Sequence, residues 1–220
     1  MKAPMFSVSP LAGFDHNELT TVDPQGGQQV VKDTAPEYGL SLNYASPRLA
    51  INDITFYTDP NDAKVWGNIL TATLYGDPES VVTWSAGAAY TWHRIEMSGM
   101  TIKVSEPLVK AGLVVRLPSL HATLNPYVGY AYEEVDTTYS NDAYDTMLAG
   151  IIARWDWRML HATGQYYYQN NPDLDEGYNV GRARLLACIN ERWAVLLRGE
   201  YVEQHGTKDT SVMIGPVLMF

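Results

Sequence analysis

The chain lacks any long apolar run: its 220 residues contain no stretch of 18 consecutive apolar side chains. A transmembrane α-helix needs about 20 predominantly apolar residues, so the sequence excludes a helical membrane span. Cysteine is almost absent, because Cys188 is the only one. An intramolecular disulfide and a zinc site built from several cysteines are therefore excluded, and we expect Cys188 to be a small buried hydrophobic side chain.

Positive charge is also scarce. The chain has 15 Lys and Arg residues against 25 Asp and Glu residues, which gives a formal net charge of −10. Binding to nucleic acid through counterion release requires clustered Lys and Arg, so we expect no nucleic-acid partner. The histidines show no metal-ligand spacing, and no glycine-rich phosphate loop links a strand to a helix. The sequence therefore predicts neither a metal site nor a cofactor.

What the sequence does contain is alternation of polar and apolar residues in strand-length segments along the whole chain. Near the start, for example, Phe6, Val8 and Phe14 alternate with Ser7 and Ser9. A period of two is typical of β-strands with one apolar face. The pattern predicts twelve strands, at roughly residues 5–15, 37–45, 49–58, 63–75, 81–93, 107–117, 120–134, 144–156, 159–168, 178–189, 193–203 and 210–220.

The connections between these segments tend to alternate between short and long. Residues 46–48 and 118–119 are short connections, whereas residues 94–106 and 135–142 are longer ones. The longest connection, residues 16–37, contains Gly26-Gly27 and is predicted to be a mobile loop. Bacterial outer-membrane barrels show this sorting, with short periplasmic turns and longer outer loops. The connection at residues 59–62 departs from the trend, because it is short where a long loop is expected.

The terminal segment Gly215-Pro216-Val217-Leu218-Met219-Phe220 combines a glycine, the apolar Leu218 and an aromatic last residue. This pattern resembles the assembly signal of Gram-negative outer-membrane β-barrels, with Gly215, Leu218 and Phe220 at its defining positions. The resemblance implies insertion by the β-barrel assembly machinery and contact with outer-membrane lipid and lipopolysaccharide. We also expect that a secretory signal was removed ahead of Met1.

Taken together, these patterns predict an all-β fold in which residues 1–220 form a single domain. The predicted architecture is a transmembrane antiparallel up-and-down β-barrel of about 12 strands, located in the bacterial outer membrane. Barrels of 10 or 8 strands, and a soluble β-barrel or sandwich, are the alternatives.

Placing the polar faces inward predicts a charged lumen. The predicted lumen and constriction residues are Arg116, Arg154, Arg182, Arg184, Arg198, His121, His161, Glu133 and Glu200. In one interpretation the arginines pair with Glu133, Asp156 and Glu200 and fill a narrow barrel. In the other they line an open path that favours anionic solutes.

In length and predicted strand number, the chain resembles the small monomeric oligosaccharide and sugar-acid channels of the outer membrane. The resemblance covers architecture only, and no motif specific to that family occurs. We therefore predict a passive, porin-like diffusion channel for small polar or anionic solutes, without enzymatic activity. The alternative is a plugged barrel with a structural, adhesive or assembly role through its outer loops.

An outer-membrane lipid hydrolase is the third hypothesis. The segment His161-Ala162-Thr163-Gly164-Gln165 resembles the His-any-Ser-Asn-Gly segment of outer-membrane phospholipase A, in which the histidine and the hydroxyl form a base and nucleophile pair. Thr163 replaces the expected serine, and Gly164 replaces the expected asparagine. The alternation also turns His161 inward, whereas the phospholipase pair faces lipid, so this hypothesis ranks below the other two.

Overall fold

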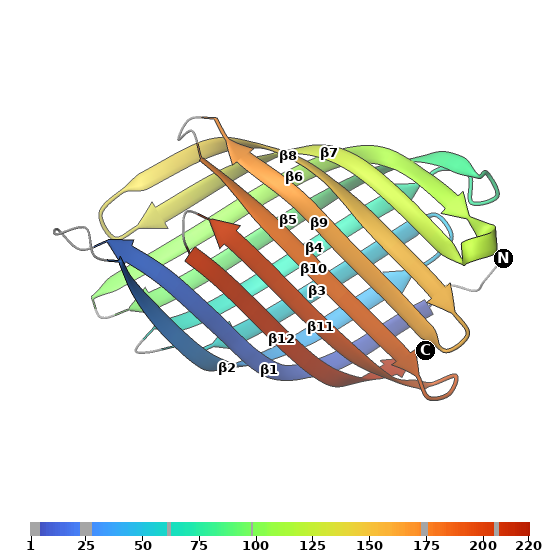
Figure 1. Cartoon of the computed structure of the whole chain (residues 1–220), viewed down its shortest axis with the longest axis horizontal. Helices are drawn as coiled ribbons and strands as arrows, with labels where there is room; N and C mark the ends of the chain where they lie inside the picture. Colours follow the sequence, from blue (N-terminus) through green and yellow to red (C-terminus); the bar gives the residue numbers. More distant parts are fainter. Residues whose placement is uncertain (1–4, 23–27, 61–62, 98, 173–175, 205–206) are drawn as a thin grey trace.

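Twelve antiparallel strands close into one barrel (Figure 1). The computed structural model describes residues 5–22, 28–60, 63–97, 99–172, 176–204 and 207–220. Each strand pairs with its neighbours in the sequence, and the first strand pairs with the last, which confirms the predicted fold. The strands are β1 (Met5–Val22), β2 (Gln28–Ala45), β3 (Leu49–Thr58), β4 (Lys64–Tyr75), β5 (Val82–Met97), β6 (Met100–Leu117), β7 (Ala122–Thr137), β8 (Asn141–Trp157), β9 (Leu160–Asn171), β10 (Glu176–Cys188), β11 (Trp193–Gln204) and β12 (Thr207–Met219).

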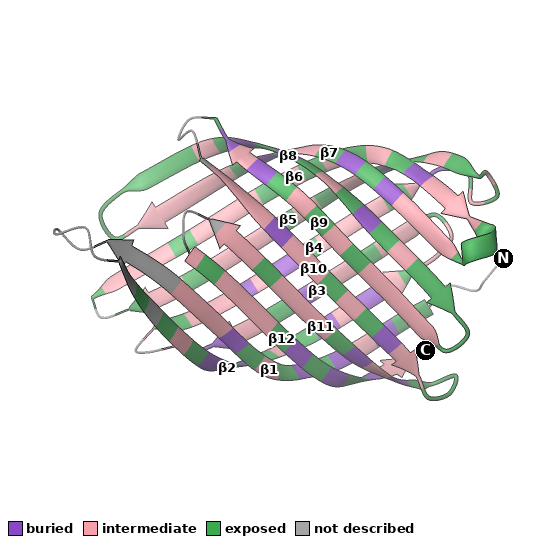
Figure 2. Ribbon diagram, in the orientation of Figure 1, coloured by how far each residue is buried: buried purple, intermediate pink, exposed green. Residues whose placement is uncertain are grey.

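Burial alternates along the strands, as the period of two predicts (Figure 2). Ser7, Ser9 and Ser41 are almost fully buried on the inner face, whereas Phe14 and Val128 are more than 60% exposed on the outer face. The arrangement inverts that of a soluble protein, because large apolar side chains cover the outside. Such an outer face suits a lipid environment, where a closed barrel leaves no backbone edge unpaired.

The strands extend further on the long-loop side than the alternation predicts. β1 and β2 remain paired as far as Val22↔Gln28, and β5 and β6 as far as Met97↔Met100. The predictions of long connections over residues 16–37, 94–106 and 135–142 are therefore wrong for the described part, because the strands pair through most of these segments. Gly26-Gly27 lies outside the described residues, as does Asp62 of the 59–62 connection. The end of the barrel opposite the short turns is called the long-loop side below. Both strand faces in these extensions carry polar residues, so the apolar period fades although the backbone ladder continues.

The first strand begins and the last strand ends at the same end of the barrel as the short turns (Figure 1). The β6–β7 connection there forms a short 3-10 helix, η1 (Pro118–Leu120). In the β4–β5 turn, Asp77 accepts hydrogen bonds from the Glu79 N–H (3.0 Å) and the Ser80 hydroxyl (2.8 Å). These bonds lower the pKa of the Asp77 carboxyl group. No helix among the described residues is long and apolar enough to cross a membrane.

The β1–β12 seam, where the barrel closes, depends on two glycines. A Cβ atom on Gly13 would lie 1.7 Å from the Val212 carbonyl oxygen, and one on Gly215 would lie 1.8 Å from the Pro10 carbonyl oxygen. The ladder skips from Val8↔Leu218 to Ala12↔Ile214, and the contact of Gly215 with Pro10 lies inside this gap. The hydroxyl of Ser9 bridges that gap by donating a 2.9 Å hydrogen bond to the Pro216 carbonyl. The missing side chains thus permit the close backbone approach that closes the sheet.

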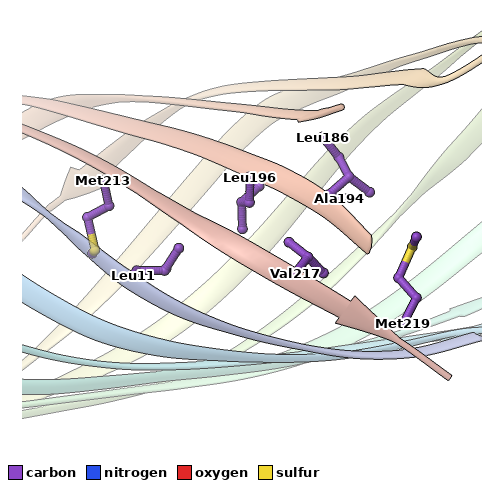
Figure 3. Close-up of a cluster of buried hydrophobic side chains, with 7 residues drawn as sticks. All are labelled: Leu11, Leu186, Ala194, Leu196, Met213, Val217 and Met219. Carbon is purple, nitrogen blue, oxygen red and sulfur yellow. The ribbon is translucent and has the colours of Figure 1, made fainter. Parts of the chain in front are cut away.

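Part of the inner wall is apolar rather than polar. Seven buried side chains from β1, β10, β11 and β12 form this cluster (Figure 3): Leu11, Leu186, Ala194, Leu196, Met213, Val217 and Met219. Cys188 packs against it, partly buried, as expected for a small hydrophobic side chain. The prediction that the lumen is lined by polar faces therefore holds for only part of the barrel interior.

Candidate functional site

A buried ion triad lies on the inner wall of β10 and β11. The ladder sets Arg182 opposite Glu200. The Nη2 atoms of Arg182 and Arg198 each lie 2.8 Å from one carboxylate oxygen of Glu200. The three side chains are between 12% and 27% exposed, so water screens them only weakly. One carboxylate therefore holds two guanidinium groups, and the triad carries one net positive charge.

Aromatic and amide side chains surround the triad. The Arg182 guanidinium lies 5.6 Å from the Tyr167 ring centroid, and the Lys110 ammonium lies 5.2 Å from that of Tyr127. Cations in such positions are attracted to the negative face of the ring. Gln165 donates a 2.6 Å hydrogen bond to the Tyr127 hydroxyl. These contacts hold the cationic groups in fixed places along the wall.

The structure adds inner-wall carboxyl groups that the sequence analysis did not assign to the lumen. Asp15 on β1 is 9% exposed and Glu37 on β2 is 4% exposed. Asp209 on β12 lies within hydrogen-bond reach of Asp15, and Glu106 on β6 accepts a 2.7 Å hydrogen bond from Gln169. Asp15, Glu37 and Glu106 stood at the edges of segments predicted to be long loops. Extending the period of two past Phe14 would place Asp15 and Asn17 on the inner face, but the outer face then carries His16 and Glu18 and no longer contrasts with it.

The two signs of charge are separated along the strands. The arginines lie in the middle of their strands or toward the short turns, as Arg154 and Arg184 do near the ends of β8 and β10. The carboxyl groups of Asp15, Asp209 and Glu106 lie in the halves nearer the long loops. The lumen is therefore more acidic toward the long-loop side and more basic toward the short turns, with the triad and Glu37 between the two ends.

The larger cavity in the lumen, called the outer cavity below, has a volume of about 450 Å³. Its lining joins the triad to the added carboxyl groups and includes Pro60 and Val65 at the long-loop side. Side chains of both signs thus face one space, together with the Phe56 and His93 rings. A cavity of this size suits a small polar molecule.

A second cavity of about 130 Å³ lies at the short-turn end. Toward this end of the barrel, two hydrogen bonds cross the lumen between strands that are not neighbours in the sheet. Arg154 on β8 donates a 2.6 Å hydrogen bond to the Tyr75 hydroxyl on β4, and Arg184 on β10 donates a 3.0 Å bond to Asn43 Oδ1 on β2. Among the described residues that line the two cavities, none lines both. The two cavities are therefore lined by separate sets of residues, and the two hydrogen bonds cross the lumen on the short-turn side of the outer cavity.

Arg116 lines the second cavity, as predicted for a lumen residue. It donates to the carbonyl oxygens of Ser80 and Asp77 and so ties β6 to the β4–β5 turn. His121 is exposed and follows η1 with a φ of 51°, so it is a turn residue and not a lumen residue as predicted. The prediction failed because the turn extends two residues beyond Ser119 before β7 begins.

Asp156 and Glu133, which one interpretation pairs with the lumen arginines, lie beside other groups. His161 Nδ1 lies 2.6 Å from Asp156 Oδ1 near the short turns, so Asp156 pairs with this histidine. Glu133 lies on the inner side of β7, close enough to Glu106 for the two charges to interact. Among the described residues, no group of three or more His, Cys, Asp or Glu side chains is arranged to hold a metal ion.

Solved structures with this fold are outer-membrane β-barrels. The translocator domain of autotransporter NalP from Neisseria meningitidis is 12% identical, with a TM-score of 0.56 over 100% of this chain and 90% of that one. The transport unit of autotransporter AIDA-I from Escherichia coli is 13% identical, with a TM-score of 0.56 over 100% and 91%. The anion-selective porin from Comamonas acidovorans is 10% identical, with a TM-score of 0.50 over 99% of each chain.

No protein-family model matches the chain, and neither does any curated protein. At identities this low, the likeness to solved structures concerns the fold alone. The chain has the fold of an outer-membrane β-barrel, and both porins and autotransporter translocators share that fold. The function must therefore be argued from the lumen itself.

Proposed function

We propose that this protein is a passive channel of the bacterial outer membrane for small polar solutes, without enzymatic activity. The observation that carries the proposal is the charged outer cavity, which lies in the lumen of a barrel whose outer face is apolar. The arginines taken alone would favour anions. The carboxyl groups of Asp15, Glu37 and Asp209 offset that preference, so we propose polar solutes rather than anions in general.

The narrow part of the proposed path lies on the short-turn side of the outer cavity. Arg184 with Asn43, and Arg154 with Tyr75, reach across the lumen there. Their hydrogen bonds join side chains rather than backbone, so solvent or a solute can replace them without breaking the sheet. We propose these four residues as the constriction.

A closed barrel that acts through its outer loops is the second candidate. The cross-lumen hydrogen bonds and the apolar cluster around Leu196 and Val217 support it, because both reduce the space near the short turns. The two candidates differ in whether the wild-type protein conducts ions.

Planar-bilayer recordings of the wild type and of the double variant Arg154→Ala, Arg184→Ala test the proposal. We expect a small conductance from the wild type. The double variant should conduct more, because two bridging side chains are removed, and its reversal potential in a salt gradient should shift toward cation selectivity. Arg192→Ala, in an exposed turn, is the matched control and should behave as the wild type. A silent wild type with a conducting double variant would instead establish the closed barrel.

Assembly by the β-barrel machinery, in contact with outer-membrane lipid and lipopolysaccharide, is part of the same proposal. The backbones of Phe220 and Phe6 pair through hydrogen bonds of 2.9 and 3.3 Å, and their ring centroids lie 6.1 Å apart. The Phe220 side chain is 69% exposed, so it contributes little to packing. These features leave the Phe220 ring accessible to an assembly factor.

Phe220→Ala is expected to lower the amount of protein inserted in the outer membrane of cells, while refolding into detergent stays near the wild-type yield. Phe6→Ala is the matched control, because it removes the same ring contact but keeps the terminal aromatic residue. Heat-dependent migration in SDS gels measures the folded fraction in both settings. If the two variants reduce insertion equally, the loss of the contact between the Phe6 and Phe220 rings explains the effect, and a role of Phe220 as an assembly signal is contradicted.

A further inference from the structure

Within the described part of the chain, buried polar atoms without a hydrogen-bond partner gather around the outer cavity. Six of the residues that carry such atoms line this one space, with acceptors and donors both represented. The atoms are Glu37 Oε2, Asp209 Oδ1, Thr58 Oγ1, Arg182 Nε, Arg198 Nη1 and His93 Nε2. Buried polar atoms in folded proteins are normally paired, so these atoms are available to water or to a polar solute.

The free atoms are sorted by charge. The anionic ones come from β2 and β12, which flank β1, and the cationic ones from β10 and β11, next to β12 in the sheet. Glu37, only 4% exposed, is close enough to Arg198 for their charges to interact, yet its Oε2 atom has no partner. A negative group and a positive group thus face the same small space from adjoining parts of the wall.

Neither side is electrically neutral by itself. Glu200 neutralises one of the two guanidinium groups of the triad, which leaves one positive charge for an external anion. On the other side, Asp15 and Asp209 lie within hydrogen-bond reach of each other, with Glu37 close by. Carboxyl groups this close favour a shared proton or a bound cation. An ammonium group fits that need, because it has one positive charge and three donors.

We propose that the outer cavity binds small zwitterions that carry both an ammonium and a carboxylate group, as amino acids do. The ammonium group contacts Glu37, Asp209 and Asp15, and the carboxylate contacts Arg182 and Arg198. The Phe56 ring, which packs edge-on against His93 with centroids 5.5 Å apart, offers an apolar surface to the rest of the solute. The inference rests on the proposed function only in that the cavity must be open to solutes from the long-loop side.

Titration calorimetry on the detergent-refolded protein tests the inference with three matched probes: alanine, propionate, which lacks the ammonium group, and ethylamine, which lacks the carboxylate. We expect alanine to bind at least about tenfold more tightly than either of the others, because only alanine satisfies both charged sides. Equal binding of ethylamine and alanine would reveal a simple cation site and overturn the inference. Equal binding of propionate and alanine, or no binding of any probe, would overturn it as well.

Glu37→Gln should weaken alanine binding about tenfold while leaving propionate binding unchanged or stronger. Asp209→Asn is a second variant with the same expectation, in case the first does not fold. Glu134→Gln is the matched control, because Glu134 lies on the outer side of β7 and the charge change is the same. An unchanged affinity in both cavity variants would overturn the inference.

Bilayer conductance in potassium chloride, recorded on the same preparations, keeps this test separate from that of the channel. A protein that conducts but does not distinguish the three probes retains the proposed function and loses the zwitterion site. A protein that binds alanine selectively but does not conduct retains the site and loses the channel.

Discussion

Glu200→Gln is expected to lower the free energy of unfolding by about 3 kcal/mol. The substitution leaves Arg182 and Arg198 without the carboxylate that both contact at 2.8 Å. It also leaves Arg198 directly opposite Arg184 in the β10–β11 ladder, so three positive charges lie together on the inner wall. Removing one partner of a buried charge pair typically lowers the free energy of unfolding by about 3–5 kcal/mol. We expect a loss near the lower end of that range, because the triad lines the outer cavity and is not fully enclosed by protein. Urea titration of the refolded barrel measures the change.

Glu203→Gln on the same strand is the control. Glu203 lies 4.0 Å from Lys208 in a pair that is almost half exposed, and we expect a change below about 1 kcal/mol. Adding Arg198→Gln to the Glu200→Gln variant should restore part of the lost stability, because it removes one of the unpaired charges. Equal effects of Glu200→Gln and Glu203→Gln would mean that the lumen is wet enough to screen the triad fully.

Gly13→Ala is expected to destabilise the barrel by about 3 kcal/mol and to lower the refolding yield. The added Cβ would lie 1.7 Å from the Val212 carbonyl oxygen, and this neighbour is backbone rather than a flexible side chain. β1 and β12 must therefore move apart at the seam that closes the barrel. The measurements are the unfolding midpoint in urea and the folded fraction in unheated SDS gels.

Gly164→Ala is the matched control for the seam. An added Cβ at Gly164, in β9, has no atom within 4 Å, so the same chemical change meets open space. We expect that variant to match or slightly exceed the wild-type stability, because alanine restricts the unfolded chain more than glycine does. Comparable losses in the two variants would show that backbone preference, and not the close approach at the seam, governs the effect.

The middle of each strand could be predicted from the sequence, whereas the outer extensions could not. Where the outer face is apolar, as at Val128 and Tyr130, the period of two identifies both the strand and its orientation. Beyond that band, as at Asp15 and Asn17, both faces are polar and the signal disappears, although the ladder continues to Val22↔Gln28. The carboxyl groups of the outer cavity were missed for this reason.

The sequence by itself determined the fold class, the twelve strands and the inward direction of Arg182, Arg198 and Glu200. These properties are local, since alternation within one strand sets which face is apolar. Only the tertiary structure decided which inward groups meet. Arg184 reaches Asn43, which is 141 residues away, and Arg154 reaches Tyr75, because closure brings distant strands across one lumen. The register and closure of the sheet fix those contacts, and they arise from the pairing of all twelve strands together.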